Sequence, residues 1–240
     1  MNLNIDKSNW TKVKLDDVCE WYQKNIPNED QADFGIKYYV TANHIDGDSL
    51  KFYRYNELAD GQKGPTITKH FEKGDLLLST RSVALRKAAI APVDGVTGEK
   101  LLVLRTKKKS ELIKDFMPFI FQSLAFWEYA QNSASGSVNK FTSWTKLRNY
   151  EFLLPPKDQQ AQLAELLWAM DEVIESENKT QHNIAKYLEA VSGRVFSRRV
   201  LTFQKEIPFE IDSQSFKEYN LNDLCDLITD GAHASPKTVE

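Results

Sequence analysis

The sequence has few of the features that mark secreted, membrane-spanning or redox-active proteins. Its 240 residues include two cysteines, Cys19 and Cys225, which stand in no metal-ligand or redox spacing. No apolar run approaches the roughly 18 residues that span a bilayer. The first ten residues, MNLNIDKSNW, lack the apolar core of a signal peptide. These absences favour a reduced, cytoplasmic protein that contacts no membrane.

Motifs for catalysis are also missing. The sequence has no phosphate-binding loop and no GxGxxG pattern. Pro155-Pro156 is not preceded by Asn or Asp and not followed by an aromatic residue, so it is not the Asn/Asp-Pro-Pro-aromatic element of amino-methyltransferases. Asp94, Glu99 and Lys100 occur in the order of a metal nuclease, but the Glu-x-Lys spacing is absent. We therefore expect no catalytic residue and no metal ligand in this chain.

The net charge of one segment is more informative than that of the whole chain. The chain as a whole has a net charge of −3, so any surface for nucleic acid must be local. Between Arg81 and Lys109 there are eight basic and two acidic residues, a local net charge of +6. Arginine and lysine neutralise phosphates, and arginine can also form two hydrogen bonds with a guanine edge.

Two segments are candidates for contacting DNA. The first, residues 80–87, is polar and basic and directly follows an expected buried strand, which would give it a rigid base. The second, residues 135–140, is a loop of small residues whose alternative interpretation is a bare linker. For residues 107–109, a solvated charge run is the favoured interpretation. The predicted DNA-binding residues are Thr80, Arg81, Ser82, Arg86, Lys87, Ser135, Ser137, Asn139 and Lys140.

The first two thirds of the chain predict a small β-rich core. Four or five short apolar segments separated by turns are expected to be strands, at 36–40, 50–55, 76–79, 88–92 and 101–105. Residues 110–131 are expected to be helical, with Pro118 kinking or splitting the helix. A last strand is expected at 150–154.

A long helix is expected after Pro155-Pro156, with Asp158 as a candidate N-cap. No proline occurs between Pro156 and Pro208, which allows a helix of about 40 residues and around 60 Å. A small domain cannot cover so long a helix, so we expect a strut that buries its apolar seam against another helix. A long surface helix on a single globule is the alternative. The seam consists of Leu163, Leu166, Met170, Val173, Ile184, Leu188, Val191 and Val195.

The end of the sequence repeats its beginning. Trp10–Cys19 aligns with Phe216–Cys225 at an offset of 206 residues, and spacing and residue class agree at six positions. A second copy of the first domain would open in this way.

These features together resemble the DNA-specificity subunit of type I restriction–modification systems, over nearly the whole chain. The most specific part, Leu154–Gln160 leading through Leu166 to Ile174, is similar to the family's "PP…EQ…I…L…D" segment, with Asp158 in place of Glu. Lys73–Ser79 resembles its "KGDIL.S" strand, and Trp10–Cys19 resembles its "W…LGD" opening, with aspartate where glycine is common. Residues 229–236 resemble the opening of a second recognition domain.

The resemblance implies an α+β fold with a β-rich target recognition domain at 1–155, a conserved, coiled-coil-type spacer helix at 156–200, and a linker with the truncated start of a second domain at 201–240. In the family, two recognition domains, held apart by two antiparallel helices, each read half of a split target in double-stranded DNA. Modification subunits dock on the helices, bind S-adenosylmethionine and methylate adenine. A translocase–nuclease subunit completes the restriction complex, which acts in the prokaryotic cytoplasm. The specificity subunit itself catalyses nothing and holds no cofactor.

The chain departs from the family in its length, because one domain and one helix are expected where a full subunit has two of each. We therefore expect a partner for the helix: a second copy in a symmetric dimer, or a separately encoded second half. A disrupted, inactive allele is a third possibility. The alternative function is a truncated interaction protein that binds modification subunits without reading DNA.

Overall fold

The computed structural model describes residues 6–60, 63–137 and 139–196. The predicted linker and second domain opening at 201–240 lie outside these residues. The chain divides into two units, Met1–Glu175 and Ser176–Glu240, and each is described by itself.

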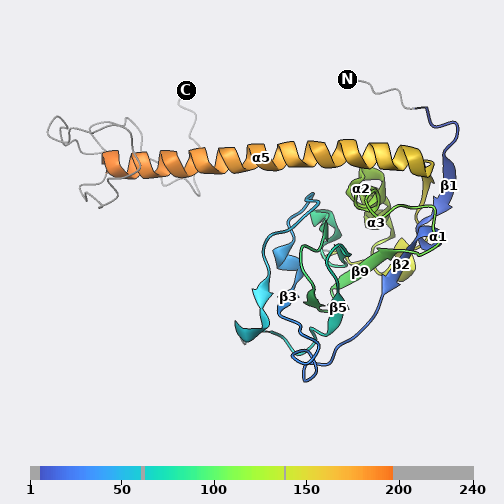
Figure 1. Cartoon of the computed structure of the whole chain (residues 1–240), viewed down its shortest axis with the longest axis horizontal. Coiled ribbons are helices and arrows are strands. Elements are labelled where there is room, and N and C mark those ends of the chain that lie inside the picture. Colours follow the sequence, from blue (N-terminus) through green and yellow to red (C-terminus); the bar gives the residue numbers. More distant parts are fainter. Residues whose placement is uncertain (1–5, 61–62, 138, 197–240) are drawn as a thin grey trace, which may run out of the picture. The chain divides into compact units, whose positions relative to one another are not determined.

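The described residues of the first unit form three small sheets, and Figure 1 labels strands from each of them. The first sheet is antiparallel, in the order β2 (Cys19–Tyr22), β9 (Leu101–Thr106), β6 (Leu76–Ser79), β7 (Ala88–Ile90). The second has the order β4 (Asn56–Glu57), β3 (Tyr38–Val40), β8 (Gly95–Thr97), β5 (Lys69–Phe71), and its β3–β8 pair is parallel. The third pairs β1 (Thr11–Lys14) antiparallel with β10 (Glu151–Leu154).

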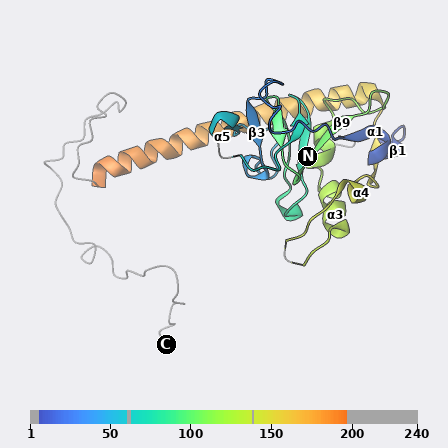
Figure 2. The ribbon, with the colours of Figure 1, turned by 90° about the horizontal axis from the view of Figure 1, so that it is seen from below.

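Short helices cover one face of the first sheet. They are α1 (Leu15–Val18), α2 (Met117–Gln122), α3 (Leu124–Ser133) and α4 (Trp144–Leu147), and Figure 2 shows α3 beside α4. Among the residues described in this unit there are also three 3-10 turns: η1 (Ala42–His44), η2 (Leu58–Asp60) and η3 (Val83–Leu85). Successive side chains of a strand point to opposite faces. Leu76 and Leu78 accordingly pack towards Phe121 and Trp127, whereas Leu77 packs with residues such as Phe52. The continuous apolar run of β6 reflects burial on both faces.

The predicted α+β fold with one long helix is confirmed, but several boundaries were wrong. Residues 50–55 form no strand, and the short β4 follows them. The strands β5 and β8 were not predicted, because their sequences, Lys-His-Phe and Gly-Val-Thr, show no apolar run. The helix expected from residue 110 begins at Met117, and Pro118 lies in its first turn, where its missing N–H costs nothing. The break falls instead at Ser123, whose extended backbone and hydroxyl cap α3 through the N–H of Phe126.

The long helix α5 (Lys157–Phe196) begins directly after Pro156. Asp158 therefore lies in its first turn and is not the N-cap. Gln160, which is fully buried, attaches the helix to the domain. Its amide nitrogen donates to the carbonyls of Glu111 (2.8 Å) and Pro155 (2.7 Å), and its amide oxygen accepts from the N–H of Ile113 (2.9 Å).

A second group of contacts holds α5 further along the first unit. The ammonium of Lys51 lies 3.0 Å from the Asp171 carboxylate and 5.0 Å from the centre of the Trp168 ring. The hydroxyl of Tyr53 donates to Glu175 at 2.5 Å. Phe119 meets Trp168 edge to face, with ring centroids 5.2 Å apart. The first turns of the helix are therefore part of the domain's own structure.

Replacement of Gln160 by alanine should destabilise the domain, because two carbonyls and one N–H would lose their buried partner. Unsatisfied buried groups cost about 1–3 kcal/mol, and in a domain of this size each kcal/mol lowers Tm by about 2–4 °C. We expect a Tm drop of about 2–12 °C for Gln160→Ala in calorimetry. Gln162→Ala, at an exposed position of the same helix, is the matched control and should leave Tm unchanged. Equal effects of the two variants would contradict the role of Gln160.

Candidate nucleic-acid interface

The two segments predicted to contact DNA lie next to each other in the structure. After β6 the chain leaves its sheet and pairs with residues 140–142. The N–H of Thr142 donates to the carbonyl of Thr80 (2.9 Å), and Arg81 and Phe141 form an antiparallel bridge. The N–H of Val83 donates to the carbonyl of Lys140 (3.3 Å). Residues from both segments therefore share one surface, which the sequence did not predict.

The turn that follows Arg81 has an unusual backbone. Ser82 (φ 50°) and Arg86 (φ 48°) flank the 3-10 turn η3, and both adopt the left-handed conformation. Asp48 (φ 57°), on the adjacent loop, is left-handed too and donates its N–H to the carbonyl of Arg86 (3.3 Å). This conformation is unfavourable for residues with a Cβ, and such strain gathers at functional sites. All three positive-φ residues other than glycine in the described chain lie in this one region.

Gly47 makes the close approach of the two loops possible. A Cβ atom on Gly47 would lie 2.3 Å from the carbonyl oxygen of Leu85, which is far inside contact distance. The buried side chain of Val83 anchors the turn from below. The turn is therefore held in place by packing and by hydrogen bonds from neighbouring segments.

Four of the nine predicted DNA-binding residues have exposed side chains and two more are only partly covered. Arg81, Ser137, Asn139 and Lys140 are exposed, and Ser82 is half-buried. Ser135 is half-buried and its hydroxyl accepts from the ammonium of Lys146 (2.6 Å).

The remaining three residues have partners within the protein. The buried Thr80 donates its hydroxyl to the carbonyl of Lys100 (3.0 Å) and so supports the loop. Arg86 pairs with Asp48 (2.5 Å), and Lys87 donates to the carbonyl of Ala42 (2.8 Å). DNA contact by all nine residues stays a prediction, and the geometry favours the exposed ones.

Sequence reasoning missed three residues of this surface. Phe141 and Leu85 are large apolar side chains with 42% and 54% of their surface exposed. Lys100 is exposed and its backbone pairs with Thr80. Phe141 could have been found from the sequence, because it directly follows Lys140. Lys100 could not, because its position beside Thr80 depends on the register between β6 and β9.

Asp94 and Glu99, the two acidic residues in the order of a metal nuclease, have separate structural roles. Asp94 accepts from the N–H of Lys73 (2.7 Å), and Glu99 pairs with Lys69 (2.8 Å). Across the residues that the structure describes, no group of histidine, cysteine, aspartate and glutamate side chains is arranged to hold a metal ion. No helix among these residues is long and apolar enough to cross a membrane.

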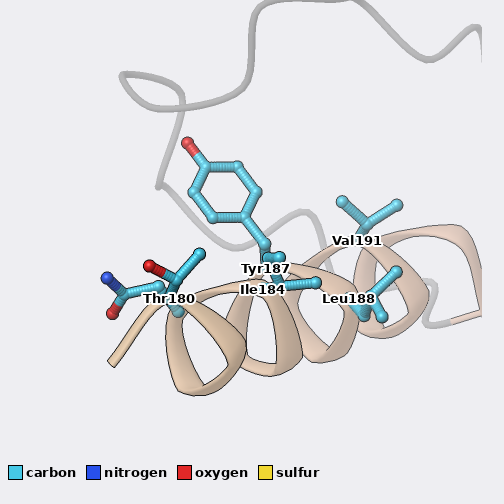
Figure 3. A pocket seen from close by; sticks show the side chains of 6 residues that line it. Thr180, Ile184, Tyr187, Leu188 and Val191 are labelled. Atoms are coloured by element: carbon cyan, nitrogen blue, oxygen red, sulfur yellow. The ribbon is translucent and has the colours of Figure 1, made fainter. Parts of the chain in front are cut away.

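Helix α5 exposes much of its predicted apolar seam. The exposed seam residues are Leu166, Met170, Val173, Ile184 and Leu188, each with more than half of its surface accessible. Leu163 and Val191 are half-buried, and the side chain of Val195 lies outside the described residues. In the second unit, Ile184, Leu188 and Val191 line an open pocket together with Thr180, Asn183 and Tyr187, and Figure 3 shows labelled side chains of this pocket along the helix. The sequence prediction omitted Ile174, which is 57% exposed.

Comparison with known proteins identifies the class of this domain. The family described as "Type I restriction modification DNA specificity domain" matches residues 7–191, so the chain belongs to that family. This is a DNA-specificity family and not a catalytic one. None of the curated proteins matches the chain.

Solved structures share the fold. The HsdS subunit from Thermoanaerobacter tengcongensis is similar with a TM-score of 0.58 and 17% identity, over 76% of this chain and 47% of that one. A chain from the structure described as "Structural basis underlying complex assembly and conformational transition of the type I R-M system" has a TM-score of 0.59 and 19% identity, over 80% and 51%. The present chain therefore corresponds to about half the length of the solved structures that it matches.

Gly47→Ala should displace the turn that carries Leu85 and Arg86. The added methyl group would meet a backbone carbonyl, and overpacking of this kind costs about 1–3 kcal/mol. We expect a lower free energy of unfolding in a urea titration and faster amide exchange at Arg86. Gly64→Ala is the matched control, because its methyl group would meet no atom within 4 Å. If Gly47→Ala is as stable as the control, the close packing of the two loops is refuted.

Proposed function

We propose that this protein binds double-stranded DNA in a sequence-specific manner, as the specificity component of a type I restriction–modification complex. It would direct adenine methylation and restriction by other subunits and catalyse no step itself. The observation that supports this proposal best is the exposed surface shared by the segments around Arg81 and Lys140, inside the region that matches the family. The side chains of Arg81 and Lys140 favour an anionic ligand, because neither forms an ion pair with a carboxylate among the described residues.

The geometry suits a groove reader better than a general polyanion binder. The chain has a net charge of −3, so bulk attraction to DNA is weak and binding depends on local contacts. Phosphate contacts position a protein on a duplex, and contacts to base edges supply specificity. The hydroxyl of Ser82 and the guanidinium of Arg81, on or next to the strained turn, and the side chains of Asn139 and Lys140 beside it can serve both purposes.

Partners are proposed for helix α5. Modification subunits, which would bind S-adenosylmethionine, and a translocase–nuclease subunit would complete the complex. The exposed apolar seam of α5 would pack against another helix. Full burial of one leucine or isoleucine side chain stabilises such a pairing by about 1.5–3 kcal/mol. A second copy of this chain in antiparallel pairing is the simplest partner, because a two-fold axis matches a helix face with itself.

The seam also supports the alternative function, an interaction protein that binds modification subunits without reading DNA. The decisive experiment is to co-express the full chain with a modification subunit and to map modified adenines across the host DNA. A split palindromic motif would support DNA reading by a symmetric dimer, and an asymmetric motif would show that another chain supplies the second half. Association with the modification subunit without any new motif would refute the proposed DNA reading and favour the alternative.

Arg81→Ala should weaken DNA binding without unfolding the protein, because the side chain is exposed. Loss of a charge-assisted hydrogen bond costs about 1.5–3 kcal/mol, which corresponds to roughly a ten- to hundredfold loss of affinity. Fluorescence anisotropy with a duplex that carries the mapped motif would measure the change. Lys108→Ala removes the same charge at an exposed position outside the proposed interface and should be nearly neutral. Equal affinity of wild type and Arg81→Ala would remove Arg81 from the interface.

The pairing of α5 can be tested by placing charge on its seam. Ile184→Asp combined with Leu188→Asp should abolish self-association, because two carboxylates would be buried between apolar side chains. Light scattering at matched concentrations should give twice the chain mass for the wild type and the single mass for the variant. Lys186→Asp, exposed on the opposite side of the same helix, should remain dimeric. A wild type that is monomeric at all concentrations would exclude the self-dimer.

A further inference from the structure

We infer that Arg81 reads the major-groove edge of a guanine and that Phe141 is the positioning residue that orients its guanidinium. This inference rests on the proposed function, because it specifies which contact supplies part of the sequence preference. It assigns different tasks to two neighbouring cations, base reading to Arg81 and phosphate binding to Lys140.

Arg81 differs from the other arginines whose side chains the structure describes. The other four form ion pairs with carboxylates: Arg54 with Asp46, Arg86 with Asp48, Arg105 with Asp75 and Glu72, and Arg148 with Asp16. Arg81 has no ion pair with a described residue, and its side chain is exposed. Its planar set of donors is therefore open to a ligand from solvent.

The backbone that carries Arg81 is fixed on both sides. The hydroxyl of Ser79, at the end of β6, accepts from the N–H of Arg81 (3.3 Å) and donates to its carbonyl (3.1 Å). The next residue towards β6, Thr80, donates its N–H to the carbonyl of Lys100 (2.9 Å) and accepts from the N–H of Thr142. An arginine on such a base loses little backbone entropy when it binds.

The guanidinium of Arg81 lies over the ring of Phe141. The central carbon of the Arg81 guanidinium lies 5.1 Å from the centre of the Phe141 ring, within the range of a cation–π contact. Phe141 is itself held by two backbone hydrogen bonds to Ser135, of 2.9 and 2.8 Å. An arginine that stacks on a ring keeps its edge donors free for a planar, two-acceptor partner.

Arg105 shows in the same protein what such an arrangement can bind. Its guanidinium carbon lies 3.5 Å from the centre of the Tyr22 ring, and two of its nitrogens donate to the two oxygens of Asp75, both at 2.7 Å. At Arg81 the aromatic support is present and the two acceptors are missing. In the major groove, the O6 and N7 atoms of guanine offer two acceptors side by side, and arginine is their commonest partner. Phosphate demands no fixed plane, so the flexible Lys140 suits it.

The test uses the full chain, co-expressed with a modification subunit, and a pool of random double-stranded DNA. Duplexes that remain bound are sequenced for the wild type, Arg81→Lys and Lys140→Ala. Arg81→Lys keeps the charge but loses the paired donors, so we expect the preference for guanine at one position to fall by about ten- to a hundredfold. Lys140→Ala should weaken all duplexes alike and reduce the salt dependence of binding by about one counterion.

Phe141→Leu should reduce the preference at the same guanine, whereas Phe141→Tyr should preserve it. A merely structural role of Phe141 would instead change Tm and weaken all duplexes equally. Replacement of that one guanine by 7-deazaguanine, which lacks the N7 acceptor, should weaken binding by the wild type more than binding by Arg81→Lys.

The possible failures are distinct. A wild type that selects no motif overturns the proposed function and this inference with it. A wild-type motif whose guanines are all retained by Arg81→Lys, or a uniform loss like that of Lys140→Ala, overturns base reading by Arg81 and leaves the proposed function intact. An unchanged motif for Phe141→Leu overturns the positioning role alone.

Discussion

The buried amide of Gln160 is the interaction on which the rest of this structure depends. It lies in the first turn of helix α5, and it bonds to the backbone of Pro155, just before the helix, and to the backbone of Glu111 and Ile113 in a distant segment of the domain. A buried amide with all of these partners fixes direction as well as distance, because each bond is lost if the helix rotates. Lys51, Tyr53 and Trp168 then repeat the attachment several turns later. The domain and the first turns of the helix therefore behave as one body.

The candidate interface depends on a different constraint: the loop that carries Arg81 is fixed by the strand that precedes it and by the neighbouring loops. Arg81 follows the inner strand β6, whose side chains are buried on both faces, so the loop begins from a strand that is packed on both sides. The segment at 140–142 closes against this loop by backbone pairing, and Gly47 allows the neighbouring loop to support it from the other side. The strain of three left-handed residues is maintained by these contacts. A loop that is both strained and anchored presents its side chains in a narrow range of directions, which base reading requires.

Much of the architecture could be predicted from the sequence, because the strands and the long helix have strong periodic patterns. The long helix was evident from the proline-free segment after Pro156, and β6 from its run of leucines. The failures occurred where the pattern is weak. The strands β5 (Lys-His-Phe) and β8 (Gly-Val-Thr) show no apolar run, and the hydroxyl of Ser123, not Pro118, decides where the helix breaks. For the interface, composition indicated both segments but not their contact. Which cations are neutralised by carboxylates depends on tertiary structure, and the sequence could not distinguish Arg81 from Arg86.

The pairing of β1 with β10 affects how readily the segment between these two strands can be exchanged. Thr11 lies opposite Leu154, so the chain enters and leaves the recognition domain at neighbouring positions. Chain ends that lie together allow a segment to be exchanged without disturbing what surrounds it. The intervening residues, which carry the candidate contacts, could therefore be exchanged as one segment without a change at the Gln160 junction or in the helix. A new target specificity would then require only an exchange of the segment between β1 and β10, and helix α5 with its proposed partners would stay the same.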